Sequence, residues 1–187
     1  NVMAAWTLRA ALRTLTILPA NRRRELEEEL GITDDDVRLF EDVARHVYVP
    51  FLTERIIGQF EGYDALEELD WAAYREKYGD IQRLDRILEA EGDSTNRYKA
   101  SKQADVLMLF YLFGADELAQ LFELMGYRFD RAMITESIDY YLARTSDGST
   151  LSRVVHAWVL SRANRPESYA LFRQALASDV DDVQGGT

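Results

Sequence analysis

The sequence of 187 residues contains no cysteine, which removes two kinds of chemistry. Without cysteine there is no disulfide framework and no thiol nucleophile, and the absence fits a reducing compartment, so we expect the protein to be cytoplasmic. Histidine is nearly absent too, since His46 and His156 are the only two and lie far apart in the sequence. No His-x-x-x-His pair or partner set for a serine triad exists, so the sequence predicts neither a metal site nor triad catalysis.

A surplus of basic residues and a long apolar run are also missing. The chain carries 22 Lys and Arg against 33 Asp and Glu, a net charge of -11. Because nucleic acids and acidic membranes are bound by a surplus of positive charge, we expect neither as a partner. The longest apolar run, at 106–113, falls well short of the roughly 20 residues of a membrane-spanning helix. Any phosphate ligand must therefore be bound by a local site.

Only three prolines and ten glycines interrupt the chain, and no segment alternates as a strand does. Apolar residues instead recur at spacings of three and four between short polar connections, which predicts an all-α chain of antiparallel helix pairs. The predicted helices cover about 2–18, 33–46, 80–90, 102–113, 116–125, 131–143, 150–163 and 166–177. The aromatic segment 50–78 is expected to be a long loop or a set of short helices.

Local signals mark several helix ends. Thr33 and Asp36 form a capping-box pattern, and Gly114 and Gly126 are expected to be left-handed helix stops. Pro166 suits a first helical position. No fixed period of the kind found in helical repeats is present, although a non-enzymatic helical interaction domain remains one interpretation of such a chain.

Lys102, Gln103 and Asp105 are polar residues at the start of an otherwise apolar stretch. Because 106–113 has no polar residue except Tyr111, the helix should be buried nearly all round, with Lys102 and Gln103 at the edge of a core. From spacing alone, a ligand site and a solvated first turn explain Lys102 and Gln103 equally well. For Asp105 we favour a structural role, as a partner of Lys102.

Together with three other segments, this motif resembles glycoside hydrolase family 65, the kojibiose, maltose and trehalose phosphorylases. The matching segments are, in order, Gln59–Tyr63, Lys102–Val106, Tyr140–Ser152 and Asp182–Thr187. Four ordered segments are far more specific than any one of them. The resemblance covers the whole chain and implies that residues 1–187 are a single partial domain, the carboxy-terminal half of an (α/α)6 catalytic barrel.

The resemblance also implies that this chain is a fragment. The family's catalytic acid, a glutamate, is expected upstream of Asn1, so the fragment alone should be inactive, because a proton donor contributes about 10²- to 10⁴-fold. We expect apolar faces that the remaining half of the barrel would cover, and association through them. A homodimer of the parent protein stays open.

By resemblance, Lys102 and Gln103 hydrogen-bond hydroxyls of the glucosyl unit that is transferred. Glu61 is a weaker candidate for the same contact. The resemblance implies that the loop of Gly148 with Ser149 and Thr150 holds phosphate, and backbone N–H groups and hydroxyls at a helix start suit an anion. Helix capping alone would also explain Ser149 or Thr150.

Asp147 departs from the family pattern, which normally has histidine at this position. A carboxylate about 4 Å from a phosphate charge costs on the order of 4 kcal/mol at an effective dielectric near 20. Asp147 could turn outward and cap the helix, or it could be the general base of an inverting hydrolase. The implied reaction is otherwise inverting phosphorolysis of an α-glucosyl disaccharide to β-glucose 1-phosphate, with inorganic phosphate as co-substrate and no metal or organic cofactor.

Overall fold

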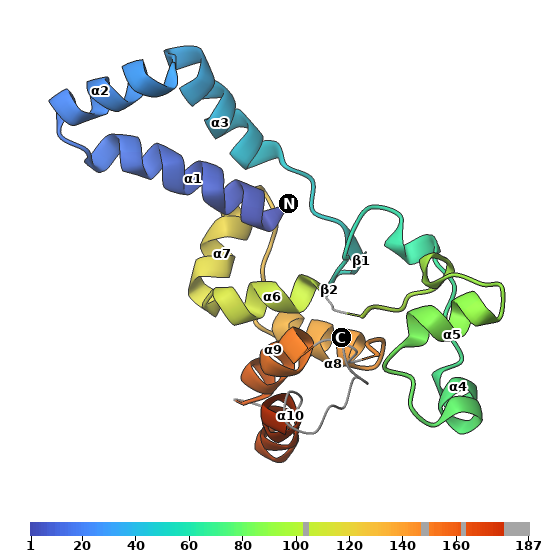
Figure 1. The fold of residues 1–187 in the computed structure, drawn as a ribbon. Coiled ribbons are helices and arrows are strands. Elements are labelled where there is room, and N and C mark those ends of the chain that lie inside the picture. The colour runs from blue at the N-terminus through green and yellow to red at the C-terminus, as the bar shows by residue number, and fades with distance from the viewer. Residues whose placement is uncertain (103–104, 147–149, 162–163, 178–187) are drawn as a thin grey trace. The chain divides into compact units, whose positions relative to one another are not determined.

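The computed structural model describes residues 1–102, 105–146, 150–161 and 164–177, and this part of the chain forms ten α-helices (Figure 1). The helices are α1 (Val2–Ile17), α2 (Ala20–Leu30), α3 (Asp34–His46), α4 (Trp71–Tyr78), α5 (Leu84–Ala90), α6 (Asp105–Leu112), α7 (Ala115–Leu124), α8 (Ala132–Leu142), α9 (Thr150–Leu160) and α10 (Arg165–Ala177). Two 3-10 turns, η1 (Tyr63–Ala65) and η2 (Thr95–Arg97), and one antiparallel pair of strands, β1 (Phe51–Thr53) and β2 (Ile56–Ile57), complete these elements. The predicted all-α class is confirmed.

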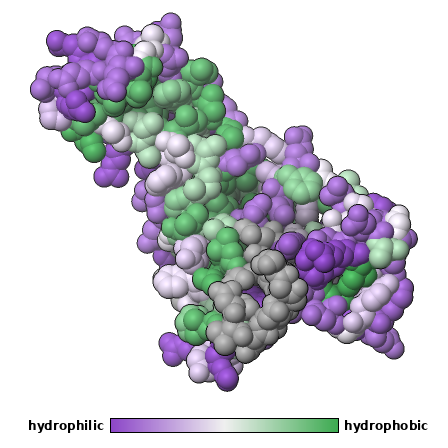
Figure 2. Space-filling model, in the orientation of Figure 1, coloured by the Kyte–Doolittle hydropathy of each residue, from purple (hydrophilic) through white to green (hydrophobic). Residues whose placement is uncertain are grey.

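The chain divides into two compact units, of which the first comprises Asn1–Val49 and Gly114–Asp130. Within this unit α1 packs against α3 and α7. The predicted capping box begins α3, because Thr33 N donates to Asp36 Oδ2 at 2.9 Å and Asp36 N donates to Thr33 Oγ1 at 3.3 Å. Figure 2 shows apolar surface over α1 and α3 beside the polar surface of α2.

Helix α2 was not predicted from the sequence because it lacks an apolar stripe. None of its residues is buried. Charged pairs one turn apart stabilise it instead, with Arg23 Nε and Glu27 Oε1 2.7 Å apart and Arg22 Nη1 and Glu25 Oε2 2.7 Å apart. Gly31, with a φ of 66°, ends the helix in the left-handed conformation.

Three local predictions were wrong. The hairpin of β1 and β2 was missed, since strands of three and two residues are too short to show alternation. Gly114 is not a left-handed stop: its φ is -72° because α7 begins at the next residue, whereas Gly126, with a φ of 80°, is confirmed. Pro166 is the second residue of α10 and not the first, although it still lies in the first turn, where no backbone N–H is needed.

The second unit comprises Pro50–Phe113 and Arg131–Thr187. Here α9 packs against α10 and α6, and α8 packs against α6 and β2. Tyr141 on α8 is fully buried and its hydroxyl donates to the carbonyl of Ile57 at 2.7 Å. The ring of Tyr63 lies 6.0 Å from that of Tyr141, so one buried aromatic pair joins the hairpin region to α8.

Replacing Tyr141 by phenylalanine should lower the free energy of unfolding by about 1–3 kcal/mol, because the buried carbonyl of Ile57 loses its donor. Urea denaturation of the full-length natural protein measures the change. Tyr111→Phe is the control, because its ring contact with Trp158, at 6.0 Å, is retained. Equal stability of the two variants would contradict the role given to the Tyr141 hydroxyl.

A polar cluster joins α4 to the end of α5. Glu91 accepts hydrogen bonds from Lys77 Nζ, from Tyr74 Oη at 2.6 Å and from Tyr78 Oη at 2.6 Å. These donors, Lys77 first, lower the pKa of Glu91 to about 2, and the bond to Glu91 raises the pKa of Tyr74 to about 12. The ionised carboxylate therefore holds the two helices together over a wide pH range.

Stability that depends on Glu91 should be lost in acid. Since its pKa in the folded protein, about 2, lies below the ordinary value of 4.5, the stabilisation is complete above pH 4.5 and disappears as the pH falls towards 2. The difference in unfolding free energy between wild type and Glu91→Gln should therefore shrink from pH 7 to pH 3, as measured by chemical denaturation. Glu89→Gln, in the last turn of α5, is the control. A stability difference between wild type and Glu91→Gln that is constant with pH would refute the linkage.

Candidate functional site

Residues from three of the four sequence segments, or directly beside them, meet at Ser101 in the second unit. Ser101 N donates to the carbonyl of Arg144 at 2.9 Å, and Ser146 N donates to the carbonyl of Ser101 at 2.9 Å. These two bonds pair Ser101 with Thr145 in a parallel bridge. We call this arrangement the Ser101 junction. It fixes the backbone beside Lys102 against the backbone that leads from α8 towards α9.

Side chains add two further links to the Ser101 junction. Gln59 Nε2 donates to Ser101 Oγ at 3.3 Å, which brings in the Gln59–Tyr63 segment. Ser152, buried in the first turn of α9, donates its hydroxyl to the carbonyl of Lys102 at 3.1 Å. Ser101 is itself buried, so its backbone groups need these partners. Segments up to 93 positions apart along the sequence, Gln59 and Ser152, are thereby tied to one point.

A charged network flanks the junction. Arg144 binds Glu68 with two nitrogens, Nε to Oε2 at 3.0 Å and Nη2 to Oε1 at 3.1 Å, and its guanidinium lies 3.8 Å from the ring centre of Tyr140. Lys99 Nζ lies 3.6 Å from the same carboxylate. Glu68 is half exposed, so each pair contributes about 0–1 kcal/mol. The network orients the Arg144 side chain more than it stabilises the fold.

Three acidic residues near the junction, Glu67, Glu68 and Asp70, each have a structural partner. All three are exposed, but Glu67 Oε2 lies 3.1 Å from Arg97 Nη2 and Asp70 accepts from Ala73 N at 3.0 Å to cap α4. The spacing of Asp70 before α4 could have revealed the cap. The arginine partner of Glu67 is 30 positions away and that of Glu68 is 76 positions away, so no local sequence pattern could predict either pair.

Lys102 is exposed, and the prediction that it begins a buried helix was wrong. Helix α6 begins at Asp105, which is also exposed. The reason is the junction: Ser101 uses its backbone N–H and carbonyl to pair with another segment, so the chain enters the helix only after Lys102. An exposed ammonium group next to a rigid backbone remains able to bind a sugar hydroxyl.

Helix α6 is apolar but not buried all round, which corrects a second expectation about this segment. Leu112 is 49% exposed. The buried side chains of 106–113 are Val106, Leu107, Leu109, Phe110 and Phe113. The helix therefore presents one side to solvent or to a further element, as expected of a helix that packs against α8 and α9 only on part of its circumference within this unit.

Glu61 is exposed and follows the junction residue Gln59 by two positions. Gly62, with a φ of 86°, turns the backbone directly after it. The other predicted residues, Gln103, Asp147, Gly148 and Ser149, the side chain of Thr150 and the whole fourth segment, lie outside the described residues. Their roles stay predictions.

Histidine and acidic side chains form no metal-binding group of three or more within the described ranges. His156 is buried on α9, and His46 is a surface residue whose Nδ1 lies 3.0 Å from Asp42 Oδ1. No described helix is long and apolar enough to span a membrane.

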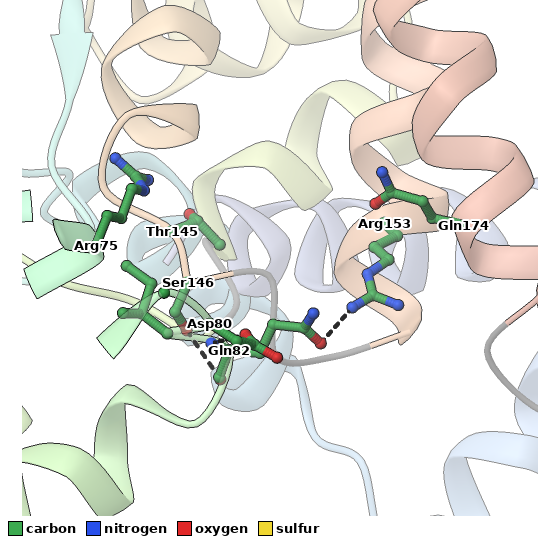
Figure 3. A pocket seen from close by; sticks show the side chains of 9 residues that line it. Arg75, Asp80, Gln82, Thr145, Ser146, Arg153 and Gln174 are labelled. Atoms are coloured by element: carbon green, nitrogen blue, oxygen red, sulfur yellow. Dashed lines mark hydrogen bonds between the residues drawn. The ribbon is translucent and has the colours of Figure 1, made fainter. Parts of the chain in front are cut away.

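A pocket of about 220 Å³ opens beside the Ser101 junction (Figure 3). Its walls come from the end of α4 and the loop after it, from the segment between α8 and α9, and from α9 and α10. The lining residues are Arg75, Gly79, Asp80, Ile81, Gln82, Thr145, Ser146, Arg153 and Gln174. Thr145 and Ser146 therefore belong both to the junction and to the pocket wall.

Removing the hydroxyl of Ser152 should loosen the junction. Ser152→Ala leaves the carbonyl of Lys102 without this donor, so we expect a loss of about 1 kcal/mol in unfolding free energy. Ser161→Ala is the matched control, since its hydroxyl also donates to a carbonyl, that of Trp158 at 2.7 Å, but is exposed. In denaturant titration, Ser161→Ala should lose less than about 0.5 kcal/mol of unfolding free energy. Equal losses in the two variants would mean that the hydrogen bond from Ser152 stabilises the fold no more than an exposed one does.

The chain is similar in sequence to known glycosyl hydrolases and phosphorylases. The model of the glycosyl hydrolase family 65 central catalytic domain matches residues 1–187. An uncharacterized glycosyl hydrolase of Mycobacterium tuberculosis is 59% identical over 187 residues, which is 100% of this chain and 14% of that protein. The trehalose 6-phosphate phosphorylase of Lactococcus lactis is 39% identical over 189 residues, 100% of this chain and 23% of that protein.

A solved structure shares the fold. A human-microbiome protein provisionally called a kojibiose phosphorylase superposes with a TM-score of 0.62 at 21% identity, over 86% of this chain and 19% of that one. The likeness agrees with the (α/α)6 class predicted from the sequence. The chain spans only 14% and 23% of the lengths of the two curated relatives above.

Proposed function

Because this chain belongs to glycosyl hydrolase family 65, we propose that it is part of an inverting phosphorylase that cleaves an α-glucosyl disaccharide with inorganic phosphate. The products are β-glucose 1-phosphate and the released sugar. A relative with 39% identity over the whole chain bears the name of a phosphorylase, which supports phosphorolysis as the reaction class. No metal or organic cofactor enters the proposal.

The Ser101 junction is the observation that carries the proposal. It unites the first three of the four segments by which the sequence resembles the family, through Gln59, through Ser101 beside Lys102, and through Arg144–Ser146. Residues that share a ligand must share a place in the fold, and the junction brings these three segments to one place. The junction also fixes the backbone from which the exposed Lys102 side chain extends, because the Lys102 carbonyl accepts a hydrogen bond from Ser152.

In the proposed reaction a phosphate oxygen attacks the anomeric carbon on the side opposite the glycosidic oxygen. The bond from that carbon to the glycosidic oxygen breaks, and the oxygen takes a proton from the catalytic acid, which we place outside these residues. The attack inverts the anomeric centre. Lys102 and Gln103 would donate hydrogen bonds to glucosyl hydroxyls, Glu61 would accept one, and Gly148, Ser149 and Thr150 would bind phosphate.

Phosphate dependence tests this function directly. The full-length protein is incubated with kojibiose, maltose, trehalose and trehalose 6-phosphate, with and without phosphate, and the anomeric product is identified by NMR. We expect β-glucose 1-phosphate only when phosphate is present. Lys102→Met should lower kcat/KM by about 10- to 100-fold, the effect of one hydrogen bond to a charged group.

Lys99→Met is the matched control for Lys102→Met. Lys99 lies three residues before Lys102, but its ammonium group is directed to Glu68, 3.6 Å away. It should leave kcat/KM nearly unchanged. Equal losses in the two variants would refute a specific sugar contact for Lys102.

A hydrolase is the second candidate, and Asp147 in place of the usual histidine is the observation that favours it. A carboxylate at this position could deprotonate a water molecule in place of binding phosphate. Release of β-glucose in the absence of phosphate would establish this function. Asp147→Asn should then abolish turnover, whereas in a phosphorylase it should preserve or improve the use of phosphate, because a repulsive charge is removed.

A further inference from the structure

The pocket beside the Ser101 junction has the size and the lining of a site for an anionic group. Its volume of about 220 Å³ lies below the roughly 300–1,000 Å³ of pockets that enclose a whole small-molecule ligand. It can hold a compact group or one end of a sugar derivative, but not a complete disaccharide. Gln82, Ser146 and Arg153 supply polar side chains to its walls.

Charge separates this pocket from the rest of the chain. Its lining includes two arginines, Arg75 and Arg153, and one carboxylate, Asp80, in a chain whose net charge is -11. Asp80 Oδ1 accepts a hydrogen bond from Gln82 N at 2.9 Å, so part of its acceptor capacity is used by its own loop. Arg75 forms no ion pair in the described parts of the chain and lies over Trp71, 5.4 Å from the ring centre. The formal charges of these three side chains therefore sum to +1.

Arg153 is held in place before any ligand arrives. It is only 3% exposed, and its Nη2 donates to Gln82 Oε1 at 2.5 Å. The carbonyl of the same Gln82 accepts from Ser146 Oγ at 3.5 Å, the outer limit of a hydrogen bond. In Figure 3, Arg153 and Gln174 lie on one side of the pocket and Arg75 on the other, with Asp80, Gln82 and Ser146 between them.

We propose that this pocket binds a phosphate group, with the guanidinium of Arg153 as its main donor and Arg75 and the hydroxyl of Ser146 in support. A planar guanidinium offers parallel N–H donors that match the oxygens of a phosphate, and donors fixed before binding lose little entropy. The group is either the phosphoryl ester of a phosphorylated sugar or free inorganic phosphate. The site consists of residues other than Gly148, Ser149 and Thr150.

Binding of small probes to the full-length protein tests the site. Isothermal titration calorimetry with glucose 6-phosphate, inorganic phosphate and uncharged glucose is carried out on wild type, Arg153→Gln and Arg75→Gln. We expect Arg153→Gln to raise the Kd of a phosphate-bearing probe by about 10- to 100-fold, and the exposed Arg75 to contribute about 3- to 10-fold. Arg153→Lys keeps the charge without the fork and should fall between wild type and Arg153→Gln.

Arg55→Gln is the matched control. It removes one positive charge from the same unit, but Arg55 is exposed and paired with Glu136 at 3.0 Å, away from the pocket lining. Its Kd values should equal those of wild type. Circular dichroism shows whether Arg153→Gln folds. If it does not, the Kd values of Arg75→Gln test the proposal, because the Arg75 side chain is exposed and its replacement should not disturb folding.

The two sources of phosphate are separated by the probes. A loss confined to glucose 6-phosphate assigns the pocket to a phosphorylated sugar, and a loss confined to inorganic phosphate assigns it to the free anion. Absence of binding by both probes, or Kd values unchanged in both arginine variants, would overturn the proposal. The choice of phosphate as the ligand rests on the proposed function. Binding is measured without turnover, so the two proposals can fail separately: a protein that binds the probes but does not carry out phosphorolysis would refute the proposed function and leave the anion site standing.

Discussion

The backbone pairing of Ser101 with Arg144 and Ser146 is the constraint on which the second unit depends. The segment that reaches Ser101 is also paired with Glu67 along the way, since Glu67 N donates to Arg97 O at 2.8 Å and Lys99 N donates to Glu67 O at 2.7 Å. Buried backbone N–H and carbonyl groups need hydrogen-bond partners. This stretch is neither helix nor regular sheet, so its partners come from segments that are distant in the sequence. Gln59 and Ser152 are both hydrogen-bonded to this short segment, at Ser101 and at Lys102.

The same constraint links the two sites. Thr145 and Ser146 pair with Ser101 through the backbone on one side and line the arginine pocket on the other. The position of Lys102 and the shape of the pocket are therefore not independent. A change that shifts Ser146 would alter both, which is the physical reason to expect the proposed sugar contact and the proposed anion site to be coupled.

Helices with an amphipathic stripe or a local cap could be predicted from the sequence. The capping box of Thr33 and Asp36 and the apolar stripes of α7 and α8 depend on residues within a few positions. Features whose partners are distant were missed or wrong. Nothing near Glu68 indicates that it binds Arg144, and nothing near Lys102 indicates that Ser101 is bonded elsewhere and that Lys102 lies outside α6.

The sequence by itself determined the all-α class, most helix boundaries and, through four ordered segments, the family, because these depend on periodicity and on the order of residues along the chain. Tertiary structure decided what those segments do together. Only folding brings Gln59 and Arg144 to Ser101, leaves Lys102 exposed and places the buried guanidinium of Arg153 beside Gln82. Such contacts are set by packing between elements that are dozens of residues apart, and no local pattern encodes the distance between them.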